Sequence, residues 1–192
     1  MTRLATLLIN TAMIQFELSD HAFRFVYTTP DDPLAEPLTA GLREEYATRY
    51  REFLVQRTGP DEMEKYAPEV FAPAAGGNFV LLLDHDQVIA GGAFKRHPDP
   101  GTAEIKRMWT HPQRRRQGLA VRVMHELEAQ AARQGYRRLY LTTGSRQPEA
   151  IQLYLSLGFT AQEDLAKVTT VRIGLPFVKR LAPADMTPSE PT

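Results

Sequence analysis

Apolar and polar positions alternate in several segments of the chain, and this pattern predicts strands. Residues 23–29 (FRFVYTT) alternate in this way and end before Pro30, which predicts a first strand. Residues 78–97 contain two β-rich runs around the polar turn DHDQ and predict a hairpin, and residues 102–110 (TAEIKRMWT) predict the next strand. Further strands are predicted at residues 136–143 (YRRLYLTT), 159–162 and 169–181.

Apolar residues recur every three or four positions in other segments, which predicts helices. Residues 30–54 have this spacing after an Asp- and Pro-rich start, and residues 61–71 (DEMEKYAPEVF) predict a short helix before the breaker PAAGG. Residues 119–135 and 148–158 predict two more helices, each ending at a glycine. The periodic positions are Leu38, Leu42, Tyr46, Tyr50 and Phe53 or Leu54 in the first helix, Leu119, Val123, Leu127 and Ala131 in the third, and Ala150, Leu153, Tyr154 and Leu157 in the fourth.

The length and the order of elements predict one α/β domain, since 192 residues suffice for one core and no repeat or linker divides them. We predict an N-terminal extension at residues 1–22, the single domain at residues 23–181 and a disordered tail at residues 182–192. The first apolar stretch is interrupted by polar residues and is too short to span a bilayer, so we expect a cytoplasmic protein with no membrane partner. The sequence leaves open whether Met1 or Met13 is the start.

Charge and composition narrow the function classes. The formal net charge is zero, which argues against a dedicated nucleic-acid binder, but residues 1–95 sum to −6 and residues 96–192 to +6. The second half therefore suits an anionic ligand. The absence of cysteine excludes disulfides, thiolate metal sites and a cysteine acyl-enzyme, and the five histidines have no metal-ligand spacing, so no metal is expected.

A run of three arginines, Arg114 to Arg116, lies where the strand at 102–110 leads into the helix that starts near Leu119. The first backbone N–H groups of a helix have no partner within it and attract anions, Gly118 permits close approach of the backbone, and arginines add charge-assisted hydrogen bonds. This combination suits a pyrophosphate. The residues alone leave a solvated basic loop open as the alternative, and neither the P-loop nor the GxGxxG pattern is present.

The sequence RRQGLA at residues 115–120 resembles the [RQ]-x-x-G-x-[GA] signature of the GNAT superfamily of N-acetyltransferases. The segment AEIKRMWTHP before it looks like that family's fourth strand, and RQPEAIQLYLSLGF after it looks like the family's late helix. The resemblance covers residues 78–160 well and residues 23–180 loosely. It implies an α/β fold with a mixed, mostly antiparallel central sheet that is splayed at its middle strands and flanked by helices on both faces, with acetyl-coenzyme A in the splay.

The resemblance also implies the residues that bind the cofactor. Main-chain groups of residues 108–110 would pair with the pantetheine, and residues 115–120 would hold the pyrophosphate. Two positions depart from the family pattern: Gln147 stands where asparagine is common, and Arg116 replaces a frequent glycine, so its side chain must point outward, toward the 3′-phosphate. The expected cofactor-binding residues are Met108, Trp109, Thr110, Arg115, Arg116, Gln117, Gly118, Leu119, Ala120 and Gln147. For Trp109, a simple core position is the alternative.

The implied reaction moves an acetyl group from acetyl-coenzyme A to a primary amine by direct attack in a ternary complex. Glu104, at a position where many family members carry an acid, is the expected base, acting through water or with a pKa raised by burial; a simple ion pair with Lys106 or Arg107 is the alternative. Tyr154 matches the family tyrosine that protonates the departing thiolate, and the alternative is a core aromatic.

The acceptor is an amine of a small molecule or a peptide, and the residues do not identify it. An acidic wall would favour a cationic amine, whereas a solvated helix face is the alternative reading of the same residues. A non-catalytic acyl-coenzyme A sensor of the same fold and a nucleic-acid binder stay as competing functions, the latter disfavoured by the zero net charge; a homodimer is left open. The acidic residues are Glu44, Glu45, Glu52, Asp61, Glu62, Glu64 and Glu69.

Overall fold

A computed structural model describes residues 23–54 and 63–182 of the protein. Seven strands form one sheet in the order β1-β2-β3-β4-β5-β7-β6. The strands are β1 (Phe23–Tyr27), β2 (Asn78–Asp84), β3 (Gln87–Arg96), β4 (Thr102–Thr110), β5 (Arg138–Thr143), β6 (Thr160–Ala161) and β7 (Leu175–Arg180). The α-helices are α1 (Glu36–Arg49), α2 (Arg51–Leu54), α3 (Leu119–Arg133) and α4 (Pro148–Ser156), and short 3-10 turns lie at η1 (Pro33–Ala35), η2 (Pro68–Phe71), η3 (Pro73–Ala75), η4 (Pro112–Arg114) and η5 (Leu165–Lys167).

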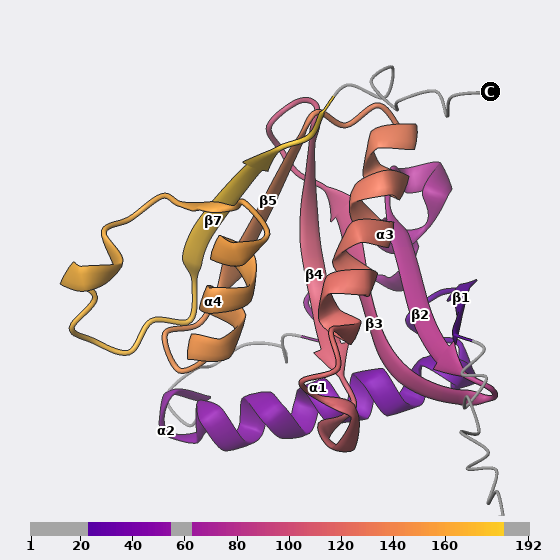
Figure 1. Ribbon diagram of the computed structural model, residues 1–192, viewed down its shortest axis with the longest axis horizontal. Helices are drawn as coiled ribbons and strands as arrows, with labels where there is room; N and C mark the ends of the chain where they lie inside the picture. Colours follow the sequence, from indigo (N-terminus) through magenta and orange to yellow (C-terminus); the bar gives the residue numbers. More distant parts are fainter. Residues whose placement is uncertain (1–22, 55–62, 183–192) are drawn as a thin grey trace, which may run out of the picture.

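The sheet is antiparallel except for one parallel pair, β4 with β5. These two strands pair only between residues 102–104 and 138–140. Beyond that point they part, and Figure 1 shows the opening between them widening toward α1. The predicted mixed, mostly antiparallel sheet with a splay at its middle strands is therefore confirmed.

A bulge in β4 contributes to this splay. Gly91 pairs with Trp109 and Ala93 with Lys106, so β4 has one residue more than β3 across this interval. Within the interval Arg107 has a φ of 56°, in the left-handed region that non-glycine residues seldom occupy. An extra residue of this kind bends a strand and increases its twist, which turns β4 away from β5.

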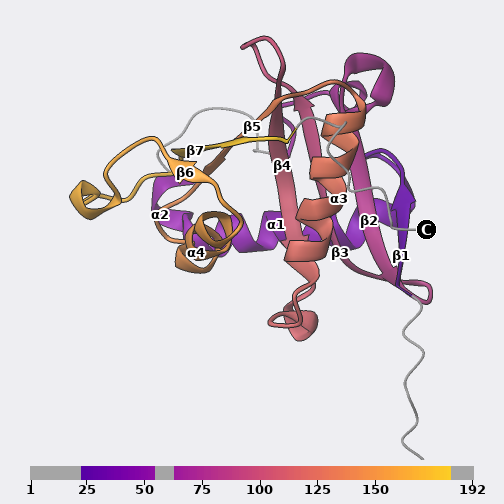
Figure 2. The same ribbon diagram turned by 45° about the horizontal axis from the view of Figure 1, so that its top comes forward.

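Helices cover both faces of the sheet, as expected. The amphipathic α3 packs on β2, β3 and β4 from one face, with α4 beside it over β5 and β7 (Figures 1 and 2). Helix α1 packs on β3 and β4 from the opposite face. Most apolar positions predicted at helical spacing are buried, and four are partly buried. The buried ones are Leu38, Leu42, Tyr50, Leu119, Val123, Leu127, Ala131 and Tyr154, and the partly buried ones are Tyr46, Ala150, Leu153 and Leu157.

Two predicted elements are shorter than expected. The segment at 61–71 forms only the 3-10 turn η2 within its described part, because Pro68 opens that turn and Pro73 prevents its continuation. The last strand begins at Leu175 rather than at residue 169, and a loop that includes Gly174 precedes it.

Other predictions lie outside the described residues. They are the extension at 1–22, the tail at 182–192 beyond its first residue, Asp61 and Glu62, and the side chains of Phe53 and Leu54. None of the described helices combines the length and the apolar character that crossing a bilayer requires.

Candidate functional site

A cavity of about 320 Å³ lies between β4 and β5, in the space that the parted strands leave. Its walls come from segments far apart in the sequence, which only the fold brings together. Helix α1 contributes Tyr46, and Tyr50 follows directly after it. Strand β4 contributes residues 105–108, and β5 with the turn after it contributes residues 141–144. Gln147 lines the cavity just before α4, and Ala150 and Tyr154 line it from α4.

Within the described residues, the edge of β4 that faces the cavity has no strand partner past Glu104. This edge includes Met108, Trp109 and Thr110, whose main-chain groups were expected to meet a pantetheine. The indole of Trp109 is 5% exposed and packs in the core on the α1 side, so the core alternative describes its side chain, and only its backbone is available to a ligand. A β-carbon added at Gly41 would lie 2.4 Å from the indole nitrogen, which explains a glycine there.

The loop that joins β4 to α3 has the backbone that its sequence predicted. Gly118 has a φ of 73° and immediately precedes α3. Arg116 has a φ of 65°, a conformation that glycine favours, and its side chain is exposed, as expected of an arginine that replaces a glycine. Gln117 is also exposed, whereas Leu119 is buried and Ala120 partly buried. Leu119 and Ala120 begin the helix, so their backbone N–H groups have no partner within it and can donate to a ligand.

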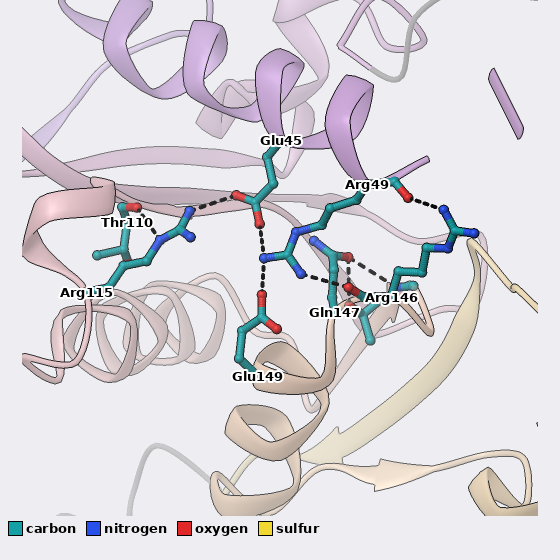
Figure 3. A network of polar contacts seen from close by, with 9 residues as sticks. Glu45, Arg49, Thr110, Arg115, Arg146, Gln147 and Glu149 are labelled. Carbon is teal, nitrogen blue, oxygen red and sulfur yellow. Dashed lines mark hydrogen bonds and ion pairs between the residues drawn. The ribbon is translucent and has the colours of Figure 1, made fainter. Parts of the chain in front are cut away.

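Two arginines of the run, Arg114 and Arg115, are tied to different parts of the fold. Arg114 forms a salt bridge with the buried Asp84 on β2, so it supports the fold. Arg115 lies 3.1 Å from Glu45 of α1 through its Nη2, and its Nε donates to the carbonyl of Thr110 at 3.4 Å (Figure 3).

Glu45 continues a chain of ion pairs that runs from the loop before α3 to the first turn of α4 (Figure 3). Arg49 lies 2.9 Å from Glu45 and also pairs with Glu149 in the first turn of α4. Arg49 donates to the carbonyl of Arg146 at 2.7 Å, and Arg146 donates back to the carbonyl of Arg49 at 2.9 Å. Helix α1 is thus tied both to the arginine loop and to the start of α4.

Gln147 lies at the cavity beside this chain of ion pairs. Its side-chain oxygen accepts hydrogen bonds at 3.2 Å from the Thr143 hydroxyl and from the backbone N–H of Gly144. The oxygen therefore closes the turn after β5, and the amide nitrogen is the group left to meet a ligand.

Tyr154 lines the cavity from α4 and packs against Phe159 and Phe177, with ring centroids 5.7 and 6.2 Å away. Burial raises the pKa of its phenol well above the usual value, so the hydroxyl stays protonated at neutral pH. Among the described residues no hydrogen-bond partner of this hydroxyl is found, and it is not one of the fully buried polar atoms that lack a partner. The position combines a core aromatic ring with a hydroxyl at the cavity.

Glu104 is buried but does not line the cavity. Its carboxylate lies 2.6 Å from the Lys95 Nζ and 2.9 Å from the Lys106 Nζ. Burial by itself would raise the pKa of this carboxyl, but the hydrogen bond from Lys95 and the charge of Lys106 bring the pKa below its usual value. The expectation of a raised pKa at Glu104 is therefore wrong, and the predicted ion pair with Lys106 is present.

Comparison with known proteins identifies the family. The sequence model of the acetyltransferase (GNAT) family matches residues 40–159. The chain belongs to this family. A search of the curated proteins finds no match.

Solved structures of GNAT-type proteins share the fold. A GNAT-family acetyltransferase from Staphylococcus aureus is 17% identical, with a TM-score of 0.63 over 84% of this chain and 100% of that one. An acetyltransferase from Streptococcus agalactiae is 18% identical, with a TM-score of 0.62 over 83% and 98%. The yncA protein of Salmonella typhimurium, solved with its cofactor acetyl-CoA, is 16% identical, with a TM-score of 0.57 over 88% and 98%.

The GNAT resemblance read from the sequence left several cavity residues unnoticed. Lys65 and Tyr66 line the cavity and belong to no motif, and Lys106 and Arg107, which also line it, were considered only as partners of Glu104. Of the acidic residues that suggested a wall for a cationic amine, the five that the structure describes do not line the cavity; two of them, Glu44 and Glu45, lie along a groove beside the arginine loop. Among the described residues, no group of three His, Cys, Asp or Glu side chains could hold a metal ion.

Proposed function

We propose that this GNAT protein transfers the acetyl group of acetyl-coenzyme A to a primary amine by direct attack in a ternary complex. The observation that carries the proposal is the cavity between β4 and β5, which opens where the parallel strands part and is bounded by the free edge of β4 and by Tyr154. The bound acetyl-CoA in the related yncA structure supports this choice of cofactor.

The cofactor would lie along β4 and α3. Main-chain groups of residues 108–110 pair with the pantetheine like an added strand. Residues 115–120 hold the pyrophosphate through the free N–H groups at the start of α3 and through their arginines, and Gln147 offers its amide nitrogen from the other side. Arg115 is paired with the Glu45 carboxylate. When the cofactor binds, its guanidinium leaves this carboxylate and binds a phosphate of the cofactor.

In the reaction the amine nitrogen attacks the thioester carbonyl carbon, and the carbon–sulfur bond breaks to release the thiolate. A backbone N–H of β4 polarises the carbonyl. Tyr154 donates its hydroxyl hydrogen to the departing sulfur; because its pKa is raised, it acts mainly as a hydrogen-bond donor to the developing charge. Glu104 takes the proton of the amine, because its carboxylate is ionised. The proton passes through water, because this carboxylate does not line the cavity.

The first test is thermal unfolding with acetyl-coenzyme A, coenzyme A and ATP. A ligand at about 100 times its dissociation constant stabilises by roughly 2.7 kcal/mol, which is about 5–10 °C for a domain of this size. We expect this shift with acetyl-coenzyme A and not with ATP, followed by thiol release with an amine panel. A shift without turnover against any amine would favour the non-catalytic sensor.

Arg115→Ala tests the phosphate site, and Arg172→Ala is its matched control. Both guanidinium groups are exposed to a similar extent, 43% and 44%, and each pairs with one glutamate. We expect both variants to unfold at similar temperatures, and only Arg115→Ala to weaken acetyl-coenzyme A binding, by about tenfold or more. Equal affinity in the two variants would remove Arg115 from the site.

A further inference from the structure

We propose that Glu45 of α1 competes with the cofactor phosphates for Arg115, and that this competition speeds the release of coenzyme A after acetyl transfer. The inference rests on the proposed function, because it concerns the same phosphate site, and it adds how that site releases its ligand. It follows from the partners of Arg115, from the way in which Glu45 is held, and from the phosphates that the substrate and the product share.

The guanidinium that we assign to a phosphate already has an anionic partner. Arg115 Nη2 lies 3.1 Å from a carboxylate oxygen of Glu45, while its Nε donates to the Thr110 carbonyl at 3.4 Å (Figure 3). The bond to Thr110 keeps the guanidinium at the end of β4, so Nη2 is the group that changes its partner. A phosphate that approaches Arg115 meets a pair whose charges cancel, and the nearby carboxylate repels it. The cofactor therefore has to displace Glu45 to gain the full charge of Arg115.

Glu45 keeps its position when Arg115 leaves it, because its second oxygen has a partner of its own. Arg49 Nη2 lies 2.9 Å from that oxygen, one turn further along α1. Arg49 is held in turn by Glu149 in the first turn of α4 and by the carbonyl of Arg146, to which it donates at 2.7 Å. The Glu45 side chain is only 18% exposed. The carboxylate therefore remains beside the phosphate site while the cofactor is bound, and it can pair with Arg115 again.

The charges of this chain of ion pairs are balanced without a ligand. Arg115 and Arg49 supply two positive charges, and Glu45 and Glu149 supply two negative ones. Within residues 23–54 and 63–182 these four side chains form no further ion pair. A phosphate adds a negative charge to a balanced set, so part of its binding free energy is spent on breaking the pair between Arg115 and Glu45.

The competition affects the substrate and the product alike. Acetyl-coenzyme A and coenzyme A carry the same phosphates, so Glu45 weakens the binding of both by the same factor. Uniform weakening of this kind leaves the barrier of the acetyl-transfer step unchanged. It matters for product release, which limits the turnover of many enzymes. When coenzyme A leaves, Arg115 passes from a phosphate to a carboxylate and is never without a counter-ion, which lowers the barrier to dissociation.

The exposure of the pair determines the size of the effect. The Arg115 side chain is 43% exposed, so water screens its interaction with Glu45. Partly exposed ion pairs are weak, and the loss of one changes an affinity by about two- to fivefold. An effect of this size is enough to shorten the lifetime of the product complex and leaves the remaining contacts of the cofactor to hold it.

The test uses Glu45→Gln, with Glu44→Gln as the matched control. Each variant removes one negative charge from α1, and both residues lie along the groove beside the arginine loop. Glu44 is exposed, and no ion pair of its side chain is found in the described part of the chain. The comparison therefore separates the contact with Arg115 from the general loss of charge. Glutamine keeps the shape of the Glu45 side chain, and Arg49 keeps Glu149, so we expect the variant to fold.

The readouts need no amine acceptor. Calorimetry gives the Kd of coenzyme A and of acetyl-coenzyme A, and stopped-flow displacement gives the dissociation rate of coenzyme A. We expect Glu45→Gln to bind both ligands about two- to fivefold more tightly, mainly through slower dissociation. Glu44→Gln should leave both values nearly unchanged, because water and salt screen an exposed charge. In a chain that carries Arg115→Ala, Glu45→Gln should no longer tighten binding, because the two residues act through one contact.

The inference and the proposed function fail in different ways. A chain that binds neither coenzyme A nor acetyl-coenzyme A overturns the proposed function and, with it, this inference. A chain that binds both, but in which Glu45→Gln binds no more tightly than Glu44→Gln, overturns the inference alone. The inference is also wrong if the gain persists without Arg115, or if it arises in the association rate.

Discussion

Replacing Tyr154 with phenylalanine isolates the hydroxyl that the mechanism uses. The ring keeps its contacts with Phe159 and Phe177, and the hydroxyl gives up no hydrogen bond found among the described residues. The substitution therefore removes one polar group at the cavity and leaves the packing of α4 intact. We expect the melting temperature to stay nearly the same, because the ring contacts are kept and the hydroxyl lies at the cavity rather than among the fully buried atoms that lack a partner.

The expected loss of activity follows from the raised pKa of Tyr154. A phenol that holds its proton tightly stabilises a thiolate mainly as a hydrogen-bond donor, and a hydrogen bond to a charged group contributes about 1.5–3 kcal/mol. If the bond forms only as the sulfur becomes negative, kcat falls by about 10- to 150-fold while KM for acetyl-coenzyme A changes little.

The pH dependence of stability gives a second readout of Tyr154. Since its folded pKa is raised above the unfolded value of about 10, the neutral phenol stabilises the fold below pH 10. That contribution is lost as the pH rises from about 10 through the folded pKa, because the unfolded chain releases the proton first. The free energy of unfolding, measured in urea, should therefore fall less above pH 10 for Tyr154→Phe than for the unchanged chain.

Tyr136→Phe is the matched control. The Tyr136 hydroxyl donates to the carbonyl of Gly76 at 2.5 Å and does not line the cavity, so its removal should cost about 1 kcal/mol of stability and no activity. A Tyr154→Phe chain that folds normally and keeps kcat within about threefold would refute the proposed role of the hydroxyl.

Three further substitutions test the structure around the site by urea unfolding. Glu104→Gln should destabilise the chain by about 3–5 kcal/mol, because Lys106 would lose its buried partner. Because the pKa of Glu104 is lowered, its stabilisation is present above the unfolded pKa of about 4.3 and is lost as the pH falls through the folded pKa; the variant should lack this acid-sensitive component. Gly144→Ala should cost about 1–3 kcal/mol, because a β-carbon there would lie 1.6 Å from the Tyr50 hydroxyl. Gly118→Ala should cost roughly 1–2 kcal/mol through its φ of 73° alone, since a β-carbon there meets nothing within 4 Å; an unchanged stability would contradict the left-handed turn.

The sequence by itself determined the features that depend on local spacing. The four-residue recurrence from Leu119 to Ala131 determined which face of α3 is buried, because helix periodicity is a local property. Gly135 and Gly158 mark the helix ends with φ values of 85° and 83°, which side chains other than glycine seldom adopt. The arginine loop before α3 was likewise visible, since both its charges and its glycine are neighbours in the chain.

The tertiary structure decided which charges meet. Glu104 faces Lys95 because the antiparallel register of β3 and β4 places these two residues opposite each other. Arg115 meets Glu45, 70 residues away, because α1 crosses the sheet beside the loop. The cations of the cavity come together only where β4 and β5 part. Periodicity specifies which face of an element is buried, but the partner across that face depends on register and docking, and these determine whether a carboxylate is a base, a counter-ion or part of a wall.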